Sequence, residues 1–185
     1  GGVYRDILKG LIHIIFTGGE PTIPRTANVI LKVMSLIYQE SVLLAGESKT
    51  LKDFSPYFEL ETNGTLFGEK HPAADVYKMV HQINCSPKLA NSGMPKSLRV
   101  NPQALQAIAD HSNGWFKLVV SSEEDWEEIH RDFQVPKEKI WLMPTVDNIK
   151  DMEESFRKAW LMGQKHRVKV TNRDHIAAFN QVTGV

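Results

Sequence analysis

Cysteine is almost absent from this sequence, since Cys85 is the only one among 185 residues. A lone cysteine excludes a disulfide within the chain and is typical of a protein kept in a reducing compartment. An excess of charge of either sign is also missing, because 22 basic and 22 acidic residues give a net charge of zero. Such a balance provides no general attraction for nucleic acid. We therefore predict a cytoplasmic protein that does not bind nucleic acid.

Long hydrophobic runs are scarce as well, and the sequence predicts no membrane span. Charges appear close to Gly1, so we expect no signal peptide. The chain is long enough to form one domain over 1–185 with a core of its own. It does not begin with Met, and we expect it to be a processed chain or part of a longer protein.

Short apolar and β-branched runs alternate with helical patterns along the chain. The predicted strands cover 11–17, 57–61, 78–84, 115–121, 140–143 and 168–171. This alternation predicts an α/β fold with a mostly parallel sheet, either open and doubly wound or curled into a barrel. In both forms, ligands bind beyond the carboxyl ends of the strands.

Helices are predicted between these strands from apolar spacing and from capping residues. The helix over 26–44 is expected to bury Val29, Ile30, Val33, Leu36, Ile37 and Leu44. Asn101-Pro102 and Ser122 with Asp125 are start signals for two shorter helices. The helix over 147–163 is expected to turn Ile149, Met152, Phe156 and Trp160 inward.

Phe16-Thr17-Gly18-Gly19-Glu20-Pro21 follows the first apolar run directly. Paired glycines lose the most backbone entropy on folding, so they are best explained by a backbone that approaches a ligand closely. The adjacent carboxylate of Glu20 suits a cationic group such as an ammonium. The alternative is a tight turn before the next helix.

Polar groups also follow the later runs. Glu61-Thr62-Asn63-Gly64 combines a carboxylate with a turn suited to Asn-Gly. Ser86-Pro87-Lys88 offers a hydroxyl, a rigid bend and a cation that suit a carboxylate or phosphate. Arg173 and His175 add a permanent cation and a group that titrates near neutrality. Each of these segments taken singly is also compatible with an ordinary surface loop.

In this order and spacing, the segments resemble the radical S-adenosylmethionine enzymes and, within them, the 7-carboxy-7-deazaguanine synthases. Three segments carry the resemblance: 16–21, 59–65 and 84–93, the last reading Asn-Cys-Ser-Pro-Lys-Leu-Ala-Asn-Ser-Gly. The run 116–120 with Asp125 and the closing Arg-x-His at 173–175 fit as well. The resemblance covers nearly the whole chain and implies a partial, incomplete TIM-like barrel of about six mostly parallel strands with helices outside.

The resemblance also implies an activity, its cofactors and its partners. These lyases contract the ring of 6-carboxy-5,6,7,8-tetrahydropterin to 7-carboxy-7-deazaguanine with loss of ammonia, on the route to queuosine and other deazapurines. They use S-adenosylmethionine, a [4Fe–4S] cluster and Mg²⁺, and they pair as homodimers. We therefore expect a small-molecule pterin substrate and a homodimeric protein.

Site residues carried over from the resemblance fall into two groups. Those expected to bind S-adenosylmethionine are Gly18, Gly19, Glu20, Glu61, Asn63, Ser86 and Lys88. Those expected near the substrate are Gly19, Arg173, His175 and the terminal Val185. No catalytic residue and no metal ligand can be assigned within this chain.

The chain departs from the family pattern in lacking the CxxxCxxC loop that holds the cluster. One thiolate cannot hold a [4Fe–4S] cluster. We expect the first strand, the cysteine loop and the Mg²⁺ ligand to lie upstream of Gly1, and this chain alone to be inactive. The alternatives are a cluster-less module that binds S-adenosylmethionine or a pterin, and another radical enzyme such as a glycyl-radical activase.

Overall fold

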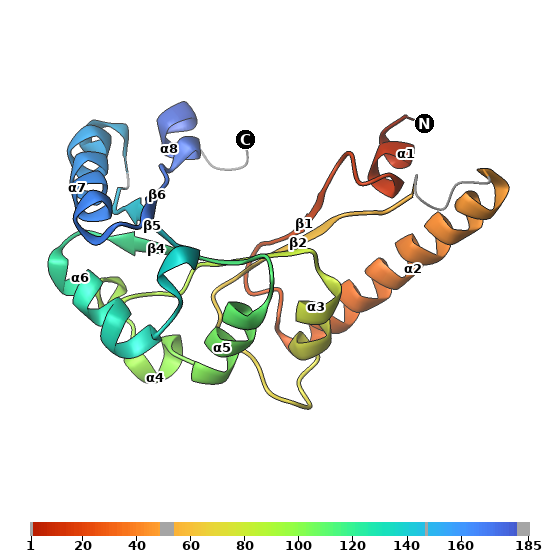
Figure 1. Cartoon of the computed structure of the whole chain (residues 1–185), viewed down its shortest axis with the longest axis horizontal. Coiled ribbons are helices and arrows are strands. Elements are labelled where there is room, and N and C mark those ends of the chain that lie inside the picture. Colours follow the sequence, from red (N-terminus) through yellow and green to blue (C-terminus); the bar gives the residue numbers. More distant parts are fainter. Residues whose placement is uncertain (1, 49–53, 147, 181–185) are drawn as a thin grey trace.

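A six-stranded sheet forms the centre of the protein in the computed structural model, which describes residues 2–48, 54–146 and 148–180 (Figure 1). The strands are β1 (Ile14–Phe16), β2 (Phe58–Thr62), β3 (Gln82–Cys85), β4 (Gly114–Val120), β5 (Ile140–Pro144) and β6 (Lys169–Val170). They lie in chain order and all neighbouring pairs are parallel. β1 and β6 form the two edges of the sheet, which is not closed. The predicted α/β fold, a partial TIM-like barrel, is confirmed.

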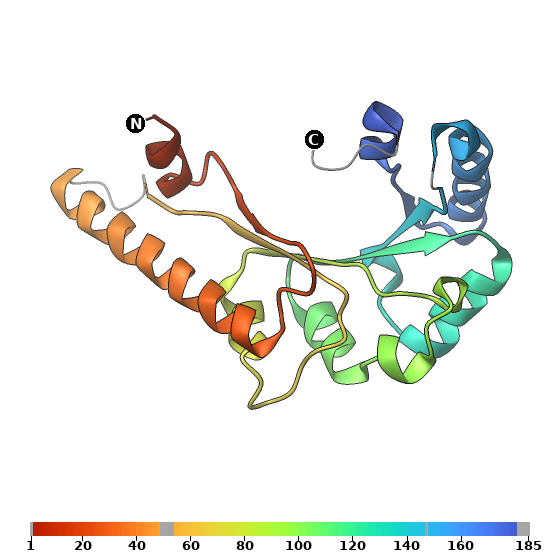
Figure 2. The ribbon, with the colours of Figure 1, turned by 180° about the vertical axis from the view of Figure 1, so that it is seen from behind.

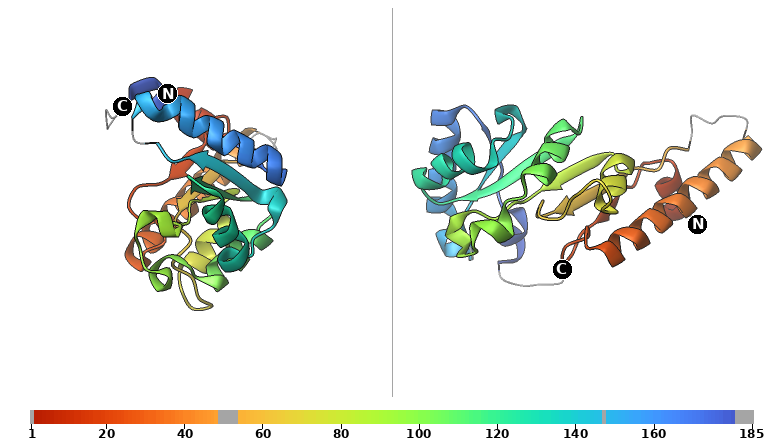
Figure 3. Two further views of the ribbon diagram at one scale, coloured as in Figure 1. Left: turned by 90° about the vertical axis from the view of Figure 1, so that its left-hand side faces the viewer. Right: turned by 90° about the horizontal axis from the view of Figure 1, so that it is seen from below.

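The helices lie in the connections between strands, except α1, which precedes β1, and α8, which follows β6. Their bounds are α1 (Gly2–Leu8), α2 (Pro24–Ser48), α3 (Ala73–Met79), α4 (Lys96–Arg99), α5 (Pro102–Asp110), α6 (Glu123–Glu128), α7 (Met152–His166) and α8 (Asp174–Phe179). Short helical turns are η2 (Ala90–Ser92), η3 (Ile129–Phe133), η4 (Lys137–Lys139) and η5 (Ile149–Asp151). Figures 1 and 2 show α3, α5 and α6 on one side of the sheet and α8 on the other. In Figure 3, α2 extends beyond the β1 edge.

The core lies between the sheet and the helices on its outer face. Along β4, Phe116, Leu118 and Val120 are buried, while the side chains between them are only half-buried. This alternation follows from the two-residue period of a strand. The outer face is therefore apolar under the helices, and the opposite, inner face carries polar and aromatic side chains.

Two predicted helix starts are confirmed by their caps. The Asn101 side chain accepts hydrogen bonds from the backbone N–H groups of Gln103 and Ala104 at the start of α5. Ser122 and Asp125 form a capping box at the start of α6. Such caps satisfy N–H groups that have no partner within the helix.

The predicted faces of the two long helices are partly wrong. α2 buries Ala27, Ile30 and Met34, whereas Val29 and Leu36 are more than half exposed. The inward face of a helix depends on the direction from which the sheet approaches it. On α2 the apolar residues are too widely distributed around the helix to indicate that direction.

In α7 the buried residues are Ala159, Met162 and Gly163, while Trp160 is 48% exposed. Ile149 lies before the helix in η5 and is also exposed. Asp147, the expected first residue, lies outside the described residues. The third strand begins at Gln82 rather than residue 78, because Lys78 and Met79 end α3.

One described helix passes a test of length and composition for a membrane span. Residues 24–46 of α2 are long and apolar enough to cross one, and only 22% of this window is buried. The inward face of the same helix packs on the core beneath β1 and β2. A helix that covers a sheet passes the same test as a membrane span.

Candidate functional site

The paired glycines lie in the turn that follows β1. Gly18 and Gly19 have φ values of +85° and +55°, in the left-handed region that favours glycine. A Cβ atom built on either residue would have no neighbour within 4 Å. The backbone conformation therefore explains the glycines, and their outer surface is open to a ligand.

Glu20 ties this turn to the end of β2. Its Oε1 accepts hydrogen bonds from the Thr22 backbone N–H at 3.0 Å, from the Thr22 hydroxyl, and from the Thr62 hydroxyl at 2.7 Å. Its Oε2 accepts the Asn63 N–H at 2.8 Å. Thr22 and Thr62 are buried. The carboxylate is thus largely engaged within the protein, with Oε2 retaining a lone pair for a further donor.

The ends of β2 and β3 are joined next to this carboxylate. The Ser86 N–H donates to the Thr62 carbonyl at 2.8 Å. Asn63 is held in its own turn, since its Oδ1 accepts the N–H and the hydroxyl of Thr65 at 2.9 and 2.6 Å. Glu20, Asn63 and Ser86 therefore belong to one hydrogen-bonded group at the carboxyl edge of the sheet, where the sequence predicted a site.

A cavity of about 480 Å³ opens beside this group. It is lined by Glu61, Ser86, Lys88, Lys117, Val119, Met143, Thr171, Asn172, Arg173 and Asp174. Four of these are predicted site residues, and they come from β2, from the segment after β3 and from the segment before α8. Three cations against two carboxylates suit a ligand that carries a negative charge. Gly18, Gly19, Glu20 and Asn63 are not part of this lining.

Two long-range hydrogen bonds hold charged side chains in the wall of this cavity. The Thr17 hydroxyl donates to Glu61 Oε2 at 3.1 Å. The Arg173 guanidinium donates to the Val146 carbonyl at 2.6 Å, which holds its position beside the cavity. Lys88 is exposed and free to turn toward a ligand.

The inner face continues as a second hollow of about 430 Å³ toward the amino ends of the strands. Lys117 and Thr171 line both hollows. The second one has Trp115 and Trp141 in its wall, with Lys169 Nζ 4.0 Å from the Trp115 ring centroid. The side-chain amides in this hollow bond mainly to one another and to Glu59, so their hydrogen-bonding groups already have partners within the protein. The hydrogen bonds are Gln82–Glu59, Gln82–Asn84, Asn84–Glu59 and Asn113–Gln82.

Two predicted substrate residues cannot be placed. Val185 lies outside the described residues, and for His175 the structure describes the backbone in α8 but not the side chain. The sequence analysis also missed Lys117 and Thr171. Lys117 is a single charge inside an otherwise apolar strand, which is a signal that points to an inward polar position.

The described residues do not fit an iron–sulfur cluster. Cys85 is fully buried, and burial raises the pKa of its thiol, with the charge of Glu20 adding to the effect. A protonated thiol is a poor metal ligand. Within residues 2–48, 54–146 and 148–180, no group of three His, Cys, Asp or Glu side chains could hold a metal ion.

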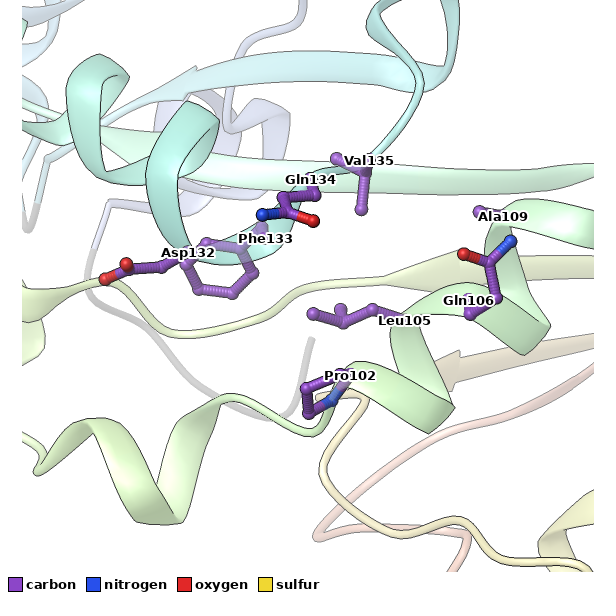
Figure 4. Close-up of a pocket in the computed structure, with 8 residues that line it drawn as sticks. All are labelled: Pro102, Leu105, Gln106, Ala109, Asp132, Phe133, Gln134 and Val135. Atoms are coloured by element: carbon purple, nitrogen blue, oxygen red, sulfur yellow. The ribbon is translucent and has the colours of Figure 1, made fainter.

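A further cavity of about 200 Å³ lies between α5 and η3 (Figure 4). Figure 4 shows Leu105, Phe133 and Val135 around it, with Gln106 and Asp132 at its sides. No residue predicted to bind a ligand lines it. It is a gap between packed elements on the outer face and not part of the candidate site.

The fold and the site define an open parallel α/β domain with a charged cavity at the carboxyl edge of its sheet. The chain is 29% identical over 193 residues to a 7-carboxy-7-deazaguanine synthase of Pyrobaculum aerophilum, covering 99% of this chain and 74% of that protein. It is 25% identical to the same-named protein of Halobacterium salinarum, covering 91% and 65%. No family model matches the chain. The chain is related to the 7-carboxy-7-deazaguanine synthases, as its motifs predicted.

Proposed function

We propose that this chain forms the S-adenosylmethionine- and pterin-binding part of a 7-carboxy-7-deazaguanine synthase. The observation that carries the proposal is the single cavity that gathers Glu61, Ser86, Lys88 and Arg173. These residues come from three segments that are far apart in the chain. Relatives of that name, aligned with nearly the whole sequence, support the same activity.

Roles follow from the chemistry of each group. Ser86 and Lys88 suit the methionine carboxylate of S-adenosylmethionine, because a hydroxyl and an ammonium both donate to it. Glu61 suits the ribose hydroxyls. The open carbonyl groups at Gly18 and Gly19 suit the methionine ammonium, with the remaining lone pair of Glu20 as a further acceptor.

The substrate side of the site is assigned to the other end of the cavity. The proposed substrate, 6-carboxy-5,6,7,8-tetrahydropterin, carries a carboxylate that Arg173 can pair with. His175 and Val185 keep their predicted roles near the substrate. Gly19, with no side chain, allows the substrate and the cofactor to lie against the same turn.

A [4Fe–4S] cluster supplies the electron that cleaves S-adenosylmethionine in radical enzymes of this class. Since this chain has one buried cysteine, the cluster ligands and the Mg²⁺ ligand are proposed to lie outside these 185 residues. The chain alone is then a binding unit without turnover. Anaerobic treatment with iron and sulfide should yield no 5′-deoxyadenosine, and formation of that product would contradict the assignment.

Calorimetric titration with S-adenosylmethionine tests the binding role. We expect Lys88→Met to weaken binding about 10- to 100-fold, because a charged hydrogen bond contributes roughly 1.5–3 kcal/mol. The matched control is Lys158→Met, in an exposed ion pair with Glu154 on α7. No binding by the wild-type chain, or equal binding by Lys88→Met, would contradict the proposal.

Two alternative functions can be distinguished from this proposal by the ligands and substrates that the protein uses. A glycyl-radical activase binds S-adenosylmethionine and acts on a protein partner rather than on 6-carboxytetrahydropterin. A cluster-less binding module binds one of the ligands and shows no turnover even with the upstream segment restored. We also propose a homodimer in the cytoplasm, and sedimentation velocity checks the oligomeric state.

A further inference from the structure

The segment between β3 and α4 carries Ser86 and Lys88, and a buried ion pair lies behind it. Arg99, in α4, pairs with Glu128, in α6, through its Nη1 and the Glu128 Oε1. The two side chains are only 6% and 4% exposed. Neither of them lines the cavity of the candidate site.

The remaining contacts of this pair go to the backbone of one loop. The Arg99 Nε donates to the Met94 carbonyl at 3.0 Å, and its Nη1 lies 3.4 Å from the Lys88 carbonyl. The Glu128 Oε2 accepts the Ala90 N–H at 2.8 Å. The pair thus contacts both ends and the middle of the loop over 88–94.

Because the ion pair is buried, a contribution to stability does not by itself explain it. Removing two charges from water costs about as much as their mutual attraction returns, and apolar side chains of similar volume often stabilise a protein as well or better. What an ion pair does supply is direction, since its donors and acceptors fix specific backbone groups. Here all of those groups belong to the loop that carries Lys88.

The rest of the loop has anchors of its own, among them the Ser92 N–H and hydroxyl, which donate to the Leu89 carbonyl at 3.1 and 2.6 Å. Leu89 is buried in the core, and the Asn91 amide donates to the Val119 carbonyl at 3.0 Å. Gly93 ends the turn η2 with φ at +74°. Between these anchors, the Lys88 carbonyl and the Ala90 N–H are oriented by the ion pair.

We propose that Arg99 and Glu128 are positioning residues, which hold the loop over 88–94 so that Lys88 faces the ligand cavity. This inference rests on the proposed function for the identity of the ligand. Its structural part, that the pair orders the loop, stands independently of the ligand. The two parts can therefore be tested by separate readouts on the same variants.

The test compares the single variant Glu128→Gln with the double variant Arg99→Met/Glu128→Leu. The double variant removes both charges, so it leaves no unpaired buried charge and should melt close to wild type. We expect amide hydrogen exchange at Ser92 and Gly93, whose N–H groups bond to the Leu89 and Ala90 carbonyls within the loop, to accelerate at least tenfold in the double variant, with exchange in β4 unchanged. S-adenosylmethionine affinity should fall about tenfold. Lys158→Met/Glu154→Gln, an exposed pair on α7, is the control and should change neither quantity.

Each outcome has a distinct meaning. Unchanged exchange at Ser92 and Gly93 in a folded double variant overturns the positioning role, whatever the ligand. Faster exchange with unchanged affinity overturns its effect on Lys88. If wild type does not bind S-adenosylmethionine, the proposed function fails, while the exchange data still decide whether the pair orders the loop. If the double variant does not fold, the same two readouts are taken on Glu128→Gln, which keeps the shape of the side chain but sets one NH₂ group against a donor and leaves the Arg99 charge without its carboxylate, so it should melt below wild type.

Discussion

Glu20 is the residue whose replacement best tests how this site is built. The resemblance assigns its carboxylate to the ammonium of a ligand, whereas the structure shows it accepting four hydrogen bonds from Thr22, Thr62 and Asn63. Glu20→Gln separates these roles. An amide keeps one acceptor oxygen and replaces the other with an NH₂ group, which cannot accept a hydrogen bond.

The loss of stability expected in Glu20→Gln follows from the four hydrogen bonds that the carboxylate accepts. If the amide oxygen takes the place of Oε1, which accepts three hydrogen bonds, the NH₂ group takes the place of Oε2. The NH₂ group then faces the Asn63 N–H, and two donors oppose each other. Losing one hydrogen bond to a charged group costs about 1.5–3 kcal/mol, and the other three bonds lose their charge assistance. We expect the free energy of unfolding to fall by about 2–3 kcal/mol. For a chain of this size, that lowers the melting temperature by roughly 5–10 °C.

The assay is thermal and urea unfolding followed by circular dichroism, with S-adenosylmethionine binding measured on the same samples. Glu61→Gln is the control, because Glu61 is exposed and accepts one hydrogen bond, from Thr17. It should stay within about 0.5 kcal/mol of wild type. A Glu20→Gln variant that is as stable as wild type but has lost ligand binding would refute the reasoning. It would show that the carboxylate serves the ligand alone.

Two further predictions concern the β2–β3 edge. Gly64→Ala should destabilise the protein by at least about 2 kcal/mol, since Gly64 has φ at +71° and an added Cβ would lie 2.6 Å from the Cys85 Sγ; an unchanged urea midpoint would contradict this. Burial raises the pKa values of Cys85 and Tyr77 above their ordinary 9.0 and 10.0, so the folded state keeps these protons more tightly than the unfolded state. Stability should therefore be level from neutral pH to about pH 8 and fall as pH rises past 9, with a shallower fall in Cys85→Ala; a urea midpoint that rises with pH would contradict the sign.

Local sequence signals identified most strands and two helix starts correctly. The apolar run over 115–121 and the caps at Asn101 and Ser122 depend on neighbouring residues only, so they can be read without the fold. The faces of α2 and α7 could not be read in this way. Burial of a helix face depends on which strands lie beneath it, and those strands come from distant parts of the chain.

For the candidate site too, some features can be predicted from the sequence and others depend on the tertiary structure. The sequence by itself determined the residue types, namely paired glycines with a carboxylate, a Ser-Pro-Lys segment and an Arg-x-His ending, because these chemistries are contiguous in the chain. Only the tertiary structure decided that Lys88 and Arg173 face one cavity, that Lys117 joins them, and that Glu20 is bonded to the end of β2. Parallel strands place the loops that follow them at one edge of the sheet, and contacts between those loops link residues more than forty positions apart.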